Sequence, residues 1–296
     1  MQRNDRRSLA MFVSSMLIFG TIGVFRRWIP VPSALLAMVR GLMGGLLILA
    51  FLRLRGQRTG QEAGRLPGKT AAVLAVSGIV MGFNWILLFE AYNHTTVGTA
   101  TLCYYMQPTI VTLLSPLLFR EKLTGRKLLC AAAAVAGMVL VSGVPEEGGG
   151  GNLKGVLLGL GAAVLYSAVV IMNKKTPGIE PYRKTTVQLL SAGLVMIPYL
   201  LLTGGFGGGT FDARAVILLL VVGAVHTGIA YVLYFGSMDG LRAQSIAIFS
   251  YIDPVSALLF SALLLGERLS LYGVIGAVLI IGSALASELN HQGENA

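Results

Sequence analysis

Ten apolar stretches, each separated from the next by a short polar segment, follow one another along the whole chain. Each is close to the length of about 20 residues with which a helix crosses the hydrocarbon core of a bilayer. We therefore predict ten transmembrane helices, at residues 8–26, 33–53, 70–91, 96–118, 126–143, 153–173, 182–203, 214–237, 243–265 and 271–288.

Composition supports an all-α integral membrane protein. Of the 296 residues, 55% are hydrophobic and 12% are charged, which is about half the charged fraction of a soluble domain. The segment "MQRNDRRS" resembles the basic start of a signal peptide, but no small-residue cleavage site follows it. We expect the first span to be retained in the protein.

The distribution of basic residues predicts the orientation in the membrane. With the N-terminus placed inside, 17 of the 23 Lys and Arg residues fall on the inner side, five fall on the outer side, and Arg40 lies within a span. Short loops rich in Lys and Arg stay in the cytoplasm, so we expect both termini there and the protein in the cytoplasmic membrane. This bias also argues against a nucleic-acid partner for the net charge of +10.

The two halves of the chain resemble each other. The Gly-rich linker 144–152 divides a first half (1–143) from a second half (153–288), which is followed by a cytoplasmic tail (289–296). At a shift of 146 residues, eight of the nineteen positions from 105 to 123 are identical to those from 251 to 269. Five spans in each half would invert the second half in the membrane, around a central cavity, as in many secondary transporters.

The same stretches resemble the EamA family of the drug/metabolite transporter superfamily. Each half ends in "P-x(12)-E-[KR]-L" before a final Gly/Ala-rich span, and the second span reads "MVRGLMGGLLIL", where this family often carries an arginine. The resemblance implies an all-helical transporter with a small-molecule substrate, often an exporter of amino acids or other metabolites. Some members of the family import sugars or carry nucleotide-sugars, so the direction of transport stays open.

Two prolines mark the expected interruptions of spans four and nine. Pro108 and Pro254 lack the N–H that would bond the carbonyls of Tyr104 and Ser250. The freed carbonyls must face protein or a wet cavity. The residue before each proline is polar, Gln107 in one half and Asp253 in the other.

Asp253 is the principal candidate for coupling or substrate binding. A charged acid at the bilayer centre costs about 2.5–3.5 kcal/mol, unless it is protonated, paired with a cation or hydrated. These alternatives correspond to proton coupling, to binding of an amine or cation, and to a polar path through the membrane. A structural alternative is permanent pairing with Arg40 or a hydrogen bond to a tyrosine.

Further candidates lie on spans three and eight. Thr227, Tyr231 and Tyr234 share one helical stripe, and His226 lies beside it with either a titrating or a packing role. The equivalent stripe of span three carries Trp85, with Asn84 adjacent. Aromatic walls with few polar groups suit an organic solute.

Three charged residues near span ends have structural alternatives. We expect Arg40 to pair with Glu90, the alternative being that Arg40 attracts a substrate carboxylate. Glu121 and Glu267 precede the last span of each half, where a carboxylate can hold free helix N–H groups. We interpret both as structural residues.

These features favour a secondary transporter. The sequence contains no P-loop for ATP and none of the common hydrolase or zinc-protease motifs. Cys103 and Cys130 have no metal-ligand or disulfide spacing, so we predict no enzyme, cofactor or metal. Multidrug or organic-cation efflux and sugar-type uptake are the alternatives, coupling to protons is open, and the protein is a monomer or a homodimer.

Overall fold

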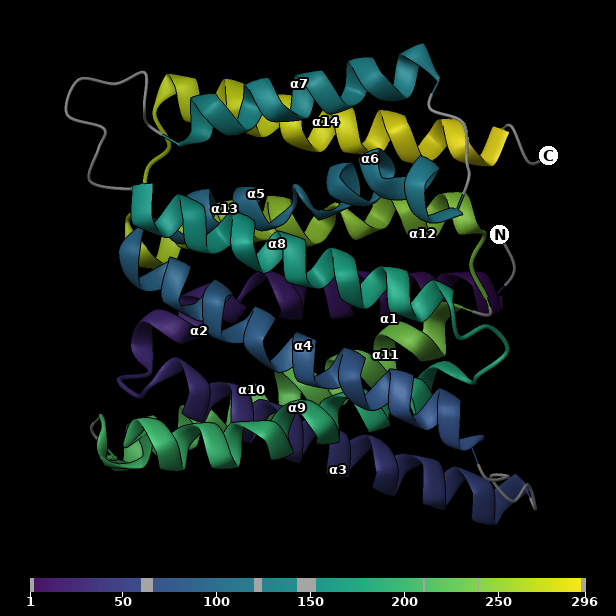
Figure 1. The fold of residues 1–296 in the computed structure, drawn as a ribbon, viewed down its shortest axis with the longest axis vertical. Helices are drawn as coiled ribbons and strands as arrows, with labels where there is room; N and C mark the ends of the chain where they lie inside the picture. The colour runs from purple at the N-terminus through teal and green to yellow at the C-terminus, as the bar shows by residue number, and fades with distance from the viewer. Residues whose placement is uncertain are drawn as a thin grey trace.

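The computed structural model describes residues 3–59, 66–119, 124–142, 153–209, 211–238 and 240–293. Every regular element in these ranges is helical (Figure 1). The predicted linker 144–152 lies outside the described residues. The helices are α1 (Arg3–Gly20), α2 (Ile22–Trp28), α3 (Ser33–Thr59), α4 (Gly68–His94), α5 (Val97–Tyr104), α6 (Gln107–Phe119), α7 (Gly125–Val141), α8 (Leu153–Lys174), α9 (Pro181–Thr203), α10 (Ala213–Gly223), α11 (Ala230–Met238), α12 (Ala243–Ser250), α13 (Ile252–Leu265) and α14 (Leu271–Gly293).

Seven segments of the described chain are long and apolar enough to cross a membrane. They are Arg6–Trp28, Ser33–Gly56, Gly68–His94, Leu153–Lys174, Pro181–Thr203, Ala213–Met238 and Ile248–Leu265. The three other predicted spans also fall on helices. One is interrupted between α5 and α6, α7 is only 17 residues long, and the apolar part of α14 ends at Ser287.

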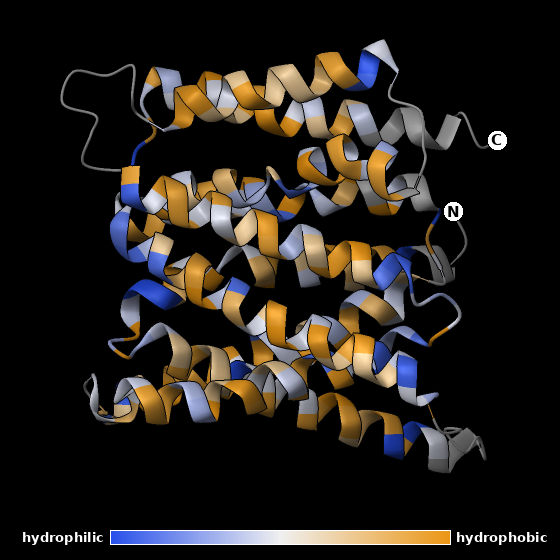
Figure 2. Cartoon of the chain, in the orientation of Figure 1, coloured by the Kyte–Doolittle hydropathy of each residue, from blue (hydrophilic) through white to orange (hydrophobic). Residues whose placement is uncertain are grey.

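The helices lie side by side with their axes along one common direction (Figure 1). Helix α1 begins and α14 ends at the same end of the bundle. Hydrophobic positions cover most of each helix, whereas hydrophilic positions gather toward the two ends (Figure 2). This banding is what a bilayer requires of a multi-pass membrane protein.

Glycines allow several helices to approach closely. A Cβ atom added at Gly41 of α3 would lie 2.6 Å from the backbone nitrogen of Gly193 in α9. One added at Gly137 of α7 would lie 2.7 Å from the carbonyl oxygen of Gly276 in α14. Small residues at such crossings permit the backbone contact that holds helices together in lipid.

Two helix breaks lie near the middle of spans four and nine. The first falls at Tyr105 and Met106, between α5 and α6, and the second at Tyr251, between α12 and α13. Pro108 and Pro254 follow within the first turn of the next helix, where a proline needs no N–H partner. The prolines thus begin the second helix of each span directly after its interruption.

Substitution of Gly41 by Ala tests the backbone contact between α3 and α9. We expect a loss of about 1–3 kcal/mol of stability, because the new methyl group overlaps the backbone of α9. Thermal unfolding of the purified protein in detergent measures the change. Gly282→Ala is the matched control, since a Cβ at that helical position meets nothing within 4 Å. An equal loss in both variants would contradict the packing.

Candidate functional site

A cavity of about 450 Å³ lies at the two helix breaks and is lined by residues of both halves of the chain. Ten of the residues that line it are aromatic. They are Phe19, Trp85, Tyr92, Tyr104, Tyr105, Tyr166, Tyr231, Tyr234, Phe235 and Tyr251. A cavity with many aromatic side chains and several polar groups is a common form of a site for an organic molecule.

Asp253 lines this cavity from the first turn of α13. The hydroxyl of Tyr105 donates a hydrogen bond to its Oδ2 at 2.7 Å. Tyr105 belongs to the break of span four and Asp253 to the turn after the break of span nine. The contact therefore joins the two interrupted spans, one from each half of the chain.

Arg40 lines the same cavity from α3. Its Nε donates to Thr227 Oγ1 at 3.0 Å, and its guanidinium carbon lies 4.2 Å from the centroid of the Trp85 ring. Stacking over an aromatic face stabilises a cation where water is scarce. Among the described residues, Arg40 forms no ion pair with an acid.

The predicted pairing of Arg40 with Glu90 is wrong. Glu90 lies near the end of α4, where its Oε1 accepts a hydrogen bond from Ser33 Oγ at 2.5 Å and its Oε2 lies 3.9 Å from His94 Nε2. The carboxylate is satisfied at the end of the bundle, and the guanidinium is left facing the cavity.

A π-helical turn at Ala224–Ile229 separates α10 from α11. It holds His226 with Nε2 2.8 Å from Thr21 Oγ1 and with its ring packed on Phe25 at 4.5 Å between centroids. His226 and Thr227 are buried and do not line the cavity, whereas Tyr231 does. The wider turn changes the register that a regular helix would give to this stripe.

Of the other predicted binding residues, most line the cavity and one does not. Trp85, Tyr104, Gln107 and Tyr234 line the cavity, together with Pro108. Asn84 points elsewhere, because its amide donates to the carbonyl oxygen of Ala162 in α8 and its side chain is fully buried.

Sequence reasoning missed a polar cluster at one end of the cavity. Gln188 of α9 donates to Ser77 Oγ at 2.6 Å and to Asn173 Oδ1 at 2.8 Å. Gln188 and Asn173 both line the cavity. Their amides within apolar spans are the signal that could have identified them. Tyr105 was also missed, although it matches Tyr251 in the internal repeat.

The sequence profile of the EamA-like transporter family matches residues 6–143 and 153–287. The chain belongs to this family. Membership makes it a multi-pass membrane transporter of small solutes, and it confirms the resemblance seen in the sequence.

Individual relatives agree with this assignment. The chain is 29% identical over 286 residues to "Uncharacterized transporter YxxF" of Bacillus subtilis, a match that covers 95% of this chain and 89% of the relative. It is 23% identical to "Protein PecM" of Dickeya dadantii, covering 90% and 86%. A solved crystal structure shares the fold at a TM-score of 0.65 and 22% identity, covering 98% of this chain and 99% of the other.

Glu267 joins two hairpins of this EamA-family transporter. Its Oε2 accepts the backbone N–H of Val97 at 2.7 Å, and its Oε1 lies 3.1 Å from Arg27 Nη2. Arg27 also donates to the carbonyl oxygen of Thr95 at 2.9 Å. Glu267 therefore holds the first N–H of α5, in the other half, whereas Ser270 bonds the N–H of Gly273 at the start of α14. Glu121, its equivalent, lies outside the described residues.

Truncation of Glu267 tests its hold on α5. Glu267→Ala removes both the ion pair and the acceptor for Val97, and we expect a loss of about 1–3 kcal/mol because a partly buried N–H is left without a partner. Glu267→Gln should cost less, since the amide oxygen can still accept that N–H. Thermal unfolding in detergent measures both. Glu180→Ala, which removes an exposed cap at α9, is the control, and an equal loss there would contradict a special role for Glu267.

Proposed function

We propose that this chain is a secondary transporter of the cytoplasmic membrane that exports amino acids or similar zwitterionic solutes. The proposal includes ten spans in two inverted five-helix repeats, with both termini in the cytoplasm. The pairs α5–α6 and α12–α13 each count as one interrupted span in this arrangement. The bias of Lys and Arg toward one set of loops supports the orientation.

One observation carries the substrate class: the cavity is lined by a cation and an acid that form no direct ion pair with each other. Arg40 and Asp253 both line it, and among the described residues no ion pair joins them. Arg40 is held by Thr227 and Trp85, and Asp253 by Tyr105. A zwitterion supplies a carboxylate for Arg40 and an ammonium for Asp253, which removes the cost of two unpaired charges.

The aromatic wall suits an apolar or aromatic side chain on that zwitterion. Tyr104 packs against Tyr166 with ring centroids 5.4 Å apart, and Tyr231 stacks on Phe235 at 5.8 Å. Such rings offer large rigid faces to a second ring or to an aliphatic chain. Small inorganic ions would leave most of this surface unused.

The geometry of the two ends supports alternating access. Glu267 and Arg27 tie the hairpins together at one end of the bundle. At the other end, the cavity is lined by Asn173, Thr185 and Met238, which lie close to the connections after α8 and α11. That end also holds the start of α1 (Figure 1), so the cavity extends toward the proposed cytoplasmic side.

Organic-cation efflux is the second candidate function. Asp253 beside tyrosines is suited to a cation, whether an amine or a larger hydrophobic ion. Arg40 opposes this reading, because a bare cation would share the cavity with an unpaired guanidinium. Binding of hydrophobic cations together with failure of all amino acids would favour efflux of drugs over our proposal.

Substrate analogues test the roles of the two charges. Arg40→Gln should raise KM for an aromatic amino acid about tenfold to a hundredfold, since hydrogen bonds to charged groups contribute about 1.5–3 kcal/mol. It should leave KM for the corresponding methyl ester, which lacks the carboxylate, unchanged. Asp253→Asn should raise KM for the amino acid by a similar factor, but it should leave KM for the N-acetyl derivative, which lacks the ammonium group, unchanged. Uptake into inside-out vesicles measures each KM.

The controls for this experiment are Arg53→Gln, an exposed position on the same helix as Arg40, and Glu180→Gln at the exposed start of α9. Both should transport like the parent protein. Equal effects of Arg40→Gln on the amino acid and on its ester would contradict contact between the guanidinium and a substrate carboxylate.

Asp253 is also the proposed site of proton coupling. An asparagine neither gains nor loses a proton, so Asp253→Asn should abolish the response of flux to an imposed pH gradient. Amino-acid flux in proteoliposomes, with and without the gradient, measures this response. His226→Asn should retain it, because His226 lies outside the cavity. Parent flux that does not change with the gradient would refute coupling.

A further inference from the structure

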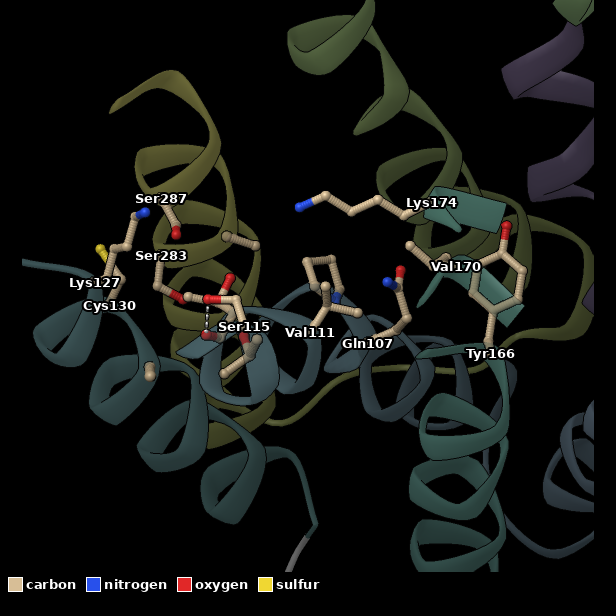
Figure 3. A pocket seen from close by; sticks show the side chains of 15 residues that line it. Gln107, Val111, Ser115, Lys127, Cys130, Tyr166, Val170, Lys174, Ser283 and Ser287 are labelled. Atoms are coloured by element: carbon tan, nitrogen blue, oxygen red, sulfur yellow. Dashed lines mark hydrogen bonds between the residues drawn. The ribbon is translucent and has the colours of Figure 1, made fainter. Parts of the chain in front are cut away.

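A second cavity, of about 370 Å³, lies between α6, α7, α8 and α14 (Figure 3). Helices α7 and α14 pack against each other at one edge of the bundle (Figure 1). The cavity therefore lies between this outlying pair and the remaining helices, where a bilayer supplies either lipid or water.

Two lysines lie at its rim. Lys127 is in the first turn of α7 and is 7% exposed, and Lys174 is the last residue of α8. Figure 3 shows Lys174 extending across the cavity and Lys127 beside Ser287 on the opposite side. An ammonium group has three donors, so each lysine can keep a contact within the protein and still bind an oxygen of a ligand.

The wall between the lysines offers acceptors for hydroxyl groups. Ser115 Oγ donates to the carbonyl oxygen of Thr112 at 2.9 Å, and Ser283 Oγ donates to that of Ile280 at 3.1 Å. Each hydroxyl proton is thus engaged, while the lone pairs of the oxygen can still accept from a ligand. No Asp or Glu is found among the described residues that line the cavity.

We propose that this cavity binds the headgroup of an anionic phospholipid of the cytoplasmic leaflet. The phosphate lies between Lys127 and Lys174, and headgroup hydroxyls such as those of phosphatidylglycerol donate to Ser115 and Ser283. Basic pockets between spans on the cytoplasmic side are suited to such headgroups. The assignment of this end to the cytoplasm rests on the proposed function.

The position of the cavity connects lipid binding to transport. Gln107, Pro108 and Tyr166 line both this cavity and the central one. A bound headgroup therefore contacts the first turn of α6, directly after the break of span four. A ligand shifts a conformational equilibrium only when it binds one state more tightly than the other. If α6 moves during transport, the headgroup contacts it differently in the two states and therefore shifts the equilibrium between them.

Lipid titration of the purified protein in detergent tests the proposal without any transport measurement. We expect phosphatidylglycerol, but not phosphatidylcholine, to raise the melting temperature. Lys127→Gln/Lys174→Gln should raise the half-saturating concentration of phosphatidylglycerol about thirtyfold, because each lysine contributes about 1 kcal/mol to binding. Lys69→Gln/Lys175→Gln is the matched control, with the same charge change at the same end and no contact with the cavity.

Several results would overturn the proposal. Equal weakening in the control pair would show only the attraction of a basic surface to anionic lipid. An equal response to glycerol phosphate would assign the cavity to a free anion instead of a lipid. Circular dichroism shows whether the double variant folds. If it does not, Lys174→Gln alone, at an exposed position, should raise the half-saturating concentration of phosphatidylglycerol about fivefold. No change in that concentration would overturn the lipid site.

Discussion

The need to satisfy every backbone N–H and C=O inside hydrocarbon governs this structure. Long helices meet the requirement alone, so an interruption is tolerated only where protein or a wet cavity surrounds it. The breaks at Tyr105 and Tyr251 both lie beside the central cavity. The cavity makes the breaks possible, and the breaks bring polar groups such as Asp253 and Gln107 to its surface.

The charges of the cavity are held by contacts that cross between the two halves of the chain. Arg40 of the first half is bonded by Thr227 of the second, and Asp253 of the second half is bonded by Tyr105 of the first. At the end of the bundle, Glu267 of the second half likewise bonds two residues of the first half, Val97 and Arg27. Movement of one half relative to the other must therefore strain or exchange these contacts.

Much of the helix placement could be predicted from the sequence, because hydropathy and proline geometry act locally. The interruptions fall next to Pro108 and Pro254 for that reason. The partners of individual side chains were harder to predict. Arg40 and Glu90 lie on neighbouring helices, yet Arg40 stacks on Trp85 and bonds Thr227, while Glu90 bonds Ser33 at the end of the bundle. His226 turns away from the cavity in a π-helical turn that no periodicity reveals. Glu267 bonds a helix of the other half, which local capping rules do not anticipate.

The asymmetry between Gln107 and Asp253 has a geometric consequence. Pseudo-symmetric halves would offer a ligand two equivalent ends, but here the cation Arg40 and the acid Asp253 make the two ends different, and aromatic rings line the wall around them. A molecule that contacts all three with groups on one tetrahedral carbon can do so in a single spatial arrangement. Its mirror image must give up one of the contacts. If an amino acid binds as proposed, the cavity therefore distinguishes its two mirror-image forms.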